Sequence, residues 1–301
     1  MKYILPLAES SGARAVGGKA FNLSQLASGG FKVPGGFVVA AKAFNEALCA
    51  ELGEFRAAGP GEAASLLPKL RERALGAVLT GGLGRELGEA WASLNARAAA
   101  VRSSAPAEDG EISSFAGQFE SFLGVKAAGL EEAVKRCWAS AFNRRAHAYG
   151  AGFAPGMAVV VQQLVEAEVS GVAFSCDPVT GDRNSVVIEA VYGLCEPLVS
   201  GSITPDHYLV EKAGLAVKES RIAVQEEYLG VNPEGGTALF PVREELRARP
   251  KLTPETLKLV TAAAVGAERL FARPADIEWA LKGGELYLLQ ARPVTGLEDI
   301  K

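Results

Sequence analysis

Two short stretches near the end of the chain carry side chains that could hold a metal ion and a phosphate. Asp276 and Glu278 alternate with apolar residues in the first stretch, and Gln290 and Arg292 do so in the second. Alternation with a period of two predicts β-strands that have one buried face and one polar face. Carboxylate and carboxamide oxygens suit a hard cation such as magnesium, and a guanidinium suits phosphate. The pattern predicts a hairpin with a metal–phosphate face; a solvated face of an ordinary hairpin is the alternative.

The register of this hairpin decides whether the polar residues share a face. Matching the apolar faces places Glu278 opposite Gln290 and Leu281 opposite Tyr287, which leaves residues 283–285 as a three-residue loop. A two-residue Gly-Gly turn would shift the register by one and would put Glu278 and Gln290 on opposite faces. We therefore expect the three-residue loop and one shared polar face.

Composition limits the class of protein. The chain has 301 residues, of which 49% are hydrophobic and 22% charged, enough to bury the core of one large or two medium domains. The net charge of -4 argues against nonspecific nucleic-acid binding. The four cysteines stand far apart without a CxxC pair, which disfavours a zinc site and predicts free thiols. The N-terminus has no secretory pattern and no apolar run has membrane-spanning length, so the expected location is the cytoplasm.

The elements that must position these residues alternate between strands and helices. We expect helices over residues 130–149 and 254–271, several short helices within 43–95, and strands over 98–102, 158–165, 171–175, 186–190 and 207–211. Strands mixed with helices predict an α/β or α+β fold rather than a bundle.

A glycine pair and a lysine offer a second phosphate site. Gly17, Gly18 and Lys19 open a helical stretch, where the first turn exposes unpaired N–H groups and the positive end of the dipole. The segment is not a Walker A loop, because Ala20 follows Lys19. A glycine turn with a surface lysine is the alternative.

Arg102 is a third candidate for binding phosphate. It ends a predicted strand and precedes two serines and a proline, and arginine makes bidentate contacts to phosphate oxygens. Pairing with Glu108 or Asp109 is the alternative. Residues 113–117 could form a mobile flap that donates backbone N–H groups, or an ordinary surface loop.

Several segments in order carry a family resemblance: Gly17-Gly18-Lys19-Ala20-Phe21-Asn22-Leu23, Val101-Arg102-Ser103-Ser104, Ser114-Phe115-Ala116-Gly117-Gln118, Gly171-Val172-Ala173-Phe174-Ser175, Thr204-Pro205-Asp206 and Gln290-Ala291-Arg292-Pro293-Val294-Thr295. Over about residues 17–295 the chain resembles the N-terminal nucleotide-binding module of the phosphoenolpyruvate synthase and pyruvate phosphate dikinase family. Rifampin phosphotransferase and the glucan water dikinases share a similar module.

The resemblance implies an α+β or α/β, ATP-grasp-like fold with mixed sheets. It implies one nucleotide-binding module over residues 1–301, with ATP clamped between lobes of about 1–157 and 158–301. Lys19 and Arg102 would hold the ATP phosphates, and Arg292 would contact the transferred phosphoryl group.

The same resemblance assigns the remaining contacts of the nucleotide. Glu278 and Gln290 would bind the catalytic magnesium ion. Backbone groups of Gln163, Leu164 and Val165 would read the adenine base, with a plain core strand as the alternative.

Enzymes of this family pass phosphate through a histidine on a central domain, and a barrel then binds phosphoenolpyruvate or pyruvate. The sequence stops where those domains would begin, and neither His147 nor His207 lies in a phosphohistidine motif. We therefore expect a kinase- or dikinase-type half-reaction on a histidine of a separate partner protein. The alternatives are a non-catalytic ATP-binding sensor and direct transfer to a small-molecule alcohol.

Overall fold

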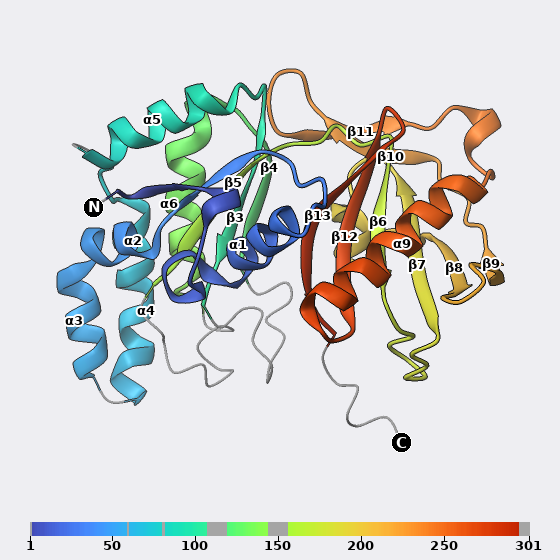
Figure 1. Cartoon of the computed structure of the whole chain (residues 1–301). Coiled ribbons are helices and arrows are strands. Elements are labelled where there is room, and N and C mark those ends of the chain that lie inside the picture. The colour runs from blue at the N-terminus through green and yellow to red at the C-terminus, as the bar shows by residue number, and fades with distance from the viewer. Residues whose placement is uncertain (1, 59, 80–81, 107–118, 144–155, 295–301) are drawn as a thin grey trace. The chain divides into compact units, whose positions relative to one another are not determined.

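The computed structural model describes residues 2–58, 60–79, 82–106, 119–143 and 156–294 (Figure 1). The chain divides into a first unit, residues 1–24 and 35–164, and a second unit, residues 25–34 and 165–301. The expected lobe boundary near residue 157 differs from this division. Strand β5 (Ala158–Gln163) belongs to the first unit because it pairs with strands β2 and β3 there.

The first unit is built on a five-stranded sheet in the order β1-β2-β5-β3-β4. Its other strands are β1 (Ile4–Pro6), β2 (Gly36–Val39), β3 (Ala99–Ser104) and β4 (Ser121–Val125). The strand predicted over residues 98–102 therefore continues to Ser104. All of these strand pairs are antiparallel.

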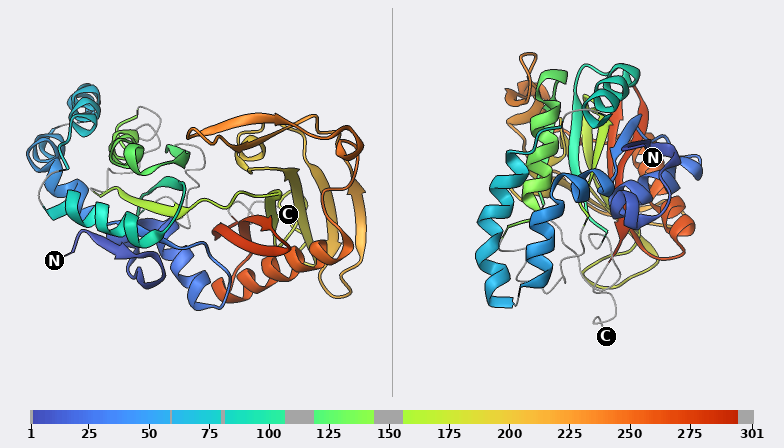
Figure 2. Two further views of the ribbon diagram at one scale, coloured as in Figure 1. Left: turned by 90° about the horizontal axis from the view of Figure 1, so that it is seen from above. Right: turned by 90° about the vertical axis from the view of Figure 1, so that its left-hand side faces the viewer.

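Helices pack against this sheet and form the core of the first unit. They are α1 (Ala13–Ser28), which continues into the second unit, α2 (Ala41–Ala47), α3 (Cys49–Ala57), α4 (Pro60–Leu75), α5 (Gly82–Leu94) and α6 (Leu130–Ser140). Helices α3 and α4 lie side by side (Figure 2). The ring of Phe44 packs edge-on against Trp138 at 6.0 Å and stacks on Phe142 at 5.8 Å. The helix predicted over residues 130–149 ends at Ser140, and residues 144–149 lie outside the described part.

The second unit contains a six-stranded sheet in the order β13-β12-β6-β7-β8-β9 and a separate two-stranded sheet. The strands are β6 (Val169–Phe174), β7 (Ser185–Tyr192), β8 (Asp206–Glu211), β9 (Val217–Arg221), β10 (Glu227–Val231), β11 (Thr237–Pro241), β12 (Ala275–Lys282) and β13 (Glu285–Pro293). Strands β6 to β9 follow one another as neighbours, and each of these pairs is antiparallel. The expected mixed sheets are therefore wrong: the strand pairs of the two main sheets are all antiparallel over the described residues.

Helix α9 (Pro254–Phe271) has the predicted bounds and covers one face of this sheet. Thr253 and Thr256 form a reciprocal cap: the hydroxyl of Thr253 accepts from the Thr256 N–H at 3.3 Å, and the hydroxyl of Thr256 accepts from the Thr253 N–H at 2.9 Å. Val260 and Ala264 are buried beneath the helix. The face of the sheet opposite α9 remains available for polar side chains.

The β12–β13 hairpin reaches the predicted pairing by a different route. The turn has two residues, Gly283 and Gly284, with φ angles of 58° and 77°, which only glycine adopts readily. Leu281 pairs with Leu286, so the predicted three-residue loop and the Leu281–Tyr287 pair are wrong. A register shift between Glu278 and Trp279 then restores the pairing of Glu278 with Gln290. An extra residue in β13 compensates for the shorter turn.

A buried ion pair fixes the loops beside strand β8. The side chains of Lys251 and Asp206 are fully buried, with Nζ 2.7 Å from Oδ1. Asp206 also accepts hydrogen bonds from the N–H groups of Ala223 and Lys251 and from the Tyr208 hydroxyl. Burial and the charge of Asp206 raise the pKa of Tyr208. Asp206 therefore has a structural role in the Thr-Pro-Asp segment.

Two further expectations concern cysteines and membranes. All four cysteines are free, as predicted, and Cys49 alone among them is exposed. Among the described residues, no helix is both long and apolar enough to cross a membrane.

Candidate phosphate and metal site

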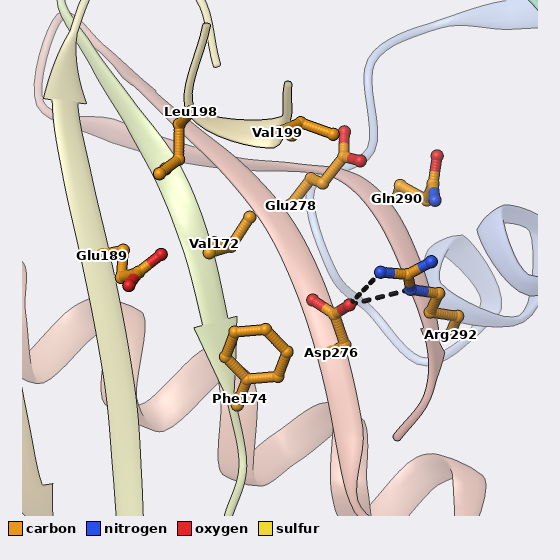
Figure 3. Close-up of a pocket in the computed structure, with 9 residues that line it drawn as sticks. All are labelled: Val172, Phe174, Glu189, Leu198, Val199, Asp276, Glu278, Gln290 and Arg292. Carbon is orange, nitrogen blue, oxygen red and sulfur yellow. Dashed lines mark hydrogen bonds and ion pairs between the residues drawn. The ribbon is translucent and has the colours of Figure 1, made fainter. Parts of the chain in front are cut away.

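A cavity of about 190 Å³ opens on the face of the six-stranded sheet opposite α9 (Figure 3). Its lining residues are Val172, Phe174, Glu189, Leu198, Val199, Asp276, Glu278, Gln290 and Arg292. The polar residues of β12 and β13 form one half of the wall. The apolar residues of β6 and the short helix α8 (Glu196–Val199) form the other half.

The four hairpin residues predicted to share a face do share it. Glu278 pairs with Gln290 and Asp276 pairs with Arg292 across β12 and β13. Their side chains point into one cavity because they alternate with the buried residues Ile277 and Ala291. The prediction that these four side chains share one face of the hairpin is confirmed.

Asp276 holds the guanidinium of Arg292 against the floor of the cavity. Arg292 Nε and Nη2 each lie 2.8 Å from Asp276 Oδ2 (Figure 3). Asp276 is only 6% exposed, and this burial raises the pKa of its carboxyl group. Arg292 lowers that pKa, whereas the negative charges of Glu278 and Glu189 raise it further. The Arg292 side chain keeps 31% of its surface exposed, so part of its donor fork can reach an anion.

The donor set suits a cation that arrives with its own oxygen ligands. Glu278 and Gln290 offer a carboxylate and an amide oxygen from neighbouring strands. No group of three or more His, Cys, Asp or Glu side chains in the described part of the chain is placed to hold a metal alone. Magnesium commonly takes one or two protein carboxylates, with phosphate oxygens and water completing its shell. The residues therefore fit a magnesium–phosphate complex better than a resident metal.

The glycine–lysine segment of the first unit packs against the end of strand β3. Gly17 interrupts α1 with a φ of 78°, and a Cβ atom there would overlap the backbone oxygen of Ser104. The hydroxyl of Ser104 donates to Val16 O at 2.8 Å and accepts from the Ala20 N–H at 3.2 Å. The kink therefore locks the segment to the strand.

This packing changes the role expected for the backbone at the helix start. The Gly18 N–H donates to Ala105 O at 3.0 Å, and the Ala20 N–H donates to Ser104. These two donors are not open to phosphate, contrary to the expectation that residues 17–19 open a helix with unpaired N–H groups. Lys19 is 8% exposed rather than on the surface, and its Nζ donates to Ser103 O at 3.2 Å. The ammonium group is thus held at the end of β3.

Replacing Gly17 with alanine is expected to destabilise the protein by about 1–3 kcal/mol. The new side chain would require a left-handed backbone and would overlap Ser104. Chemical denaturation would measure the change, with Gly53→Ala as the control because Gly53 lies in helix α3 with open space around it. An unchanged free energy of unfolding for Gly17→Ala would contradict this account of the kink.

Arg102 lies on β3 between Ser121 of β4 and Val160 of β5. It is half-buried and belongs to the same strand end as Ser103, the partner of Lys19. The structure therefore brings both predicted phosphate cations to β3 within the first unit. The predicted flap over residues 113–117 and His147 lie outside the described residues.

The segment expected to read adenine already uses two of its donors. The Gln163 N–H donates to Gly35 O at 2.7 Å, and the Leu164 N–H donates to Ala98 O at 3.1 Å. Val165 O accepts from the Ala167 N–H at 2.8 Å. Base recognition by the N–H groups of Gln163 and Leu164 would require these bonds to break, so the assignment stays a prediction that rests on Val165 and the carbonyl groups.

Glu189 is a cavity residue that the sequence-based prediction missed. It lies on β7, opposite Val172 on one side and His207 on the other. The signal was present as a single acid within an apolar strand, Val186 to Val191, but nothing local connected it with Glu278.

A family model described as "Pyruvate phosphate dikinase, AMP/ATP-binding domain" matches residues 13–301. The prodigiosin synthesizing transferase PigC of Serratia marcescens is 36% identical over 286 residues, covering 93% of this chain and 31% of the relative. The uncharacterized phosphotransferase YvkC of Bacillus subtilis is 35% identical, covering 96% of this chain and 34% of the relative. The phosphoenolpyruvate synthase of Pyrococcus furiosus is 43% identical over 66% of this chain and 26% of the relative.

The chain thus spans about a third of the length of the first two curated relatives. A solved structure, the ADP complex of N5-carboxyaminoimidazole ribonucleotide synthetase, aligns over 70% of this chain and 38% of that protein with a TM-score of 0.33 and 14% identity. The antiparallel sheets and the helices beside them confirm the predicted α+β fold class, and the ATP-grasp-like arrangement stays a prediction.

Proposed function

Because this chain belongs to the pyruvate phosphate dikinase AMP/ATP-binding domain family, we propose that it binds magnesium–ATP and phosphorylates a histidine of a separate partner protein. The observation that supports this most is the cavity of the second unit, where Glu278 pairs with Gln290 beside the Asp276–Arg292 ion pair. Oxygen ligands and a guanidinium on one face suit a metal-bound polyphosphate.

In this proposal the side chains act by positioning and by offsetting charge. Arg292 contacts the transferred phosphoryl group, and Asp276 keeps its guanidinium in place. Lys19 and Arg102 bind phosphate oxygens, and Glu278 and Gln290 hold the magnesium ion. When bound, magnesium offsets negative charge on the phosphates. Phosphoryl transfer needs this combination and needs no nucleophile within the chain.

The partner would carry the phosphohistidine and the domain for phosphoenolpyruvate or pyruvate. The greater length of the relatives supports further domains in such systems. We propose a cytoplasmic location for both proteins. A non-catalytic sensor would bind the same nucleotide without turning it over, so ATP turnover distinguishes the two functions.

Arg102→Ala is expected to slow ATP turnover by about 100-fold or more and to leave the fold intact. Removing one group that stabilises transition-state charge commonly costs this much. Formation of ADP and AMP would be followed by chromatography. Circular dichroism would confirm folding.

Arg97→Ala is the matched control for this experiment, because Arg97 is exposed and lies just before the same strand. It should turn over ATP at the rate of the unmodified protein. Unchanged turnover in Arg102→Ala would remove the phosphate role assigned to Arg102.

A further inference from the structure

Glu189 lies on the apolar side of the cavity. The proposed function assigns no role to this side. The wall near it consists of Val172, Leu198 and Val199. Among the described residues, Glu189 is the single charged residue of the lining outside β12 and β13. Figure 3 shows its carboxylate across the cavity from Glu278 and Gln290. The metal–phosphate side and the Glu189 side therefore face each other across apolar residues.

The sheet register fixes the spacing between the two sides. Glu278 pairs with Val172, and Val172 pairs with Glu189 on the next strand. Two strand spacings separate the backbones of Glu278 and Glu189 by about 10 Å. Glu189 and Glu278 nevertheless line the same cavity.

Glu189 has capacity for another hydrogen bond. Its side chain is 32% exposed, and its Oε1 lies 3.8 Å from Nδ1 of His207. This separation allows an ion pair but exceeds a hydrogen bond. An ionised carboxylate accepts several hydrogen bonds, so Glu189 can receive a donor from a molecule in the cavity.

We propose that Glu189 positions the acceptor histidine of the proposed function: one imidazole nitrogen attacks phosphorus, and the other donates its N–H to the Glu189 carboxylate. The inference rests on the proposed function, because it names the acceptor side of the same site. The lone pair of the attacking nitrogen forms the P–N bond. The P–O bond to the nucleotide breaks, and its electron pair leaves with the nucleotide oxygen. The second nitrogen keeps its hydrogen, and Glu189 offsets the positive charge on the ring.

The wall chemistry favours this ring over other acceptors. Apolar residues suit the face of an aromatic ring, and the ring carries a nucleophile at one end and a donor at the other. A negatively charged phosphate acceptor would be repelled by Glu189.

Imidazole and 1-methylimidazole distinguish this arrangement, because the methylated ring keeps a nucleophilic nitrogen but has no N–H. Acceptor-dependent ATP turnover would be measured with each compound for the unmodified protein and for Glu189→Ala. We expect the unmodified protein to prefer imidazole by about tenfold or more, the size of effect typical of a hydrogen bond to a charged group. Glu189→Ala should lose the preference while its magnesium–ATP affinity stays within about twofold.

Two control variants separate Glu189 from its surroundings. Glu219→Ala removes a carboxylate on the edge strand β9, outside the cavity, and should retain the preference. His207→Gln removes the imidazole that lies 3.8 Å from Glu189 and should retain the preference as well.

Equal preferences in the unmodified protein and Glu189→Ala would overturn the inference. So would a protein that binds magnesium–ATP but shows no acceleration by imidazole, and in that case nucleotide binding would still stand. Failure to bind magnesium–ATP would refute the proposed function, and the acceptor site would fall with it.

Discussion

Glu278→Ala is expected to remove most of the magnesium-dependent gain in ATP affinity. Glu278 is the carboxylate that pairs with Gln290, and the described chain offers no cluster of three metal-binding side chains to replace it. Loss of a protein ligand should raise the Kd for ATP with magnesium by about 10–100-fold, since even indirect support of a metal site contributes on this scale. The Kd without magnesium should change by less than about threefold, because the phosphate contacts proposed for the arginines and the lysine do not involve Glu278.

Calorimetric titration of the variant with ATP, with and without magnesium, makes this comparison. Glu227→Ala is the control, because Glu227 is an exposed acid on β10 outside the cavity. Equal losses of affinity in the two conditions would show that Glu278 supports the shape of the cavity and does not bind the metal.

Lys251→Met is expected to lower the free energy of unfolding by about 3–5 kcal/mol. The substitution removes the ammonium group that lies 2.7 Å from Asp206 and leaves a fully buried carboxylate without its counter-charge. Breaking one side of a buried pair has this cost because desolvation of the remaining charge is no longer offset. Asp206 also orders Ala223 and Tyr208, so the effect should spread through these loops.

Urea denaturation would measure the change, and Lys258→Met provides the control. Lys258 lies on the exposed face of α9, so its replacement should alter the free energy of unfolding by less than about 0.5 kcal/mol. A Lys251→Met protein as stable as this control would contradict the structural role of the ion pair.

The polar face of the hairpin could be predicted from sequence because alternation alone determines which side chains share it. The turn could not be predicted, since Gly283 and Gly284 allow a two-residue turn and the compensating extra residue in β13 leaves no distinct mark in the sequence. The error in the loop and the unforeseen register shift cancel at Glu278 and Gln290. The predicted pairing of Glu278 with Gln290 is therefore correct, although the predicted turn is wrong.

Contacts between segments that are distant in the sequence could not be predicted from it. Glu189 joins the cavity only because β6 brings β7 beside β12. Lys251 and Asp206 are 45 residues apart, and no local pattern pairs them. The N–H groups after Gly17 are used by Ser104 and Ala105, which a helix-start argument limited to neighbouring residues could not detect. Helix α9 was predictable because its cap and its apolar spacing are local.

Calorimetric titration of the unmodified chain with ATP, in the presence and absence of magnesium, would show whether the protein binds magnesium–ATP. We expect saturable binding that magnesium strengthens by about tenfold or more, because in the proposed site Glu278 and Gln290 add metal ligands to the phosphate contacts. No binding by a folded sample, or the same affinity with and without magnesium, would contradict the proposed magnesium–ATP site.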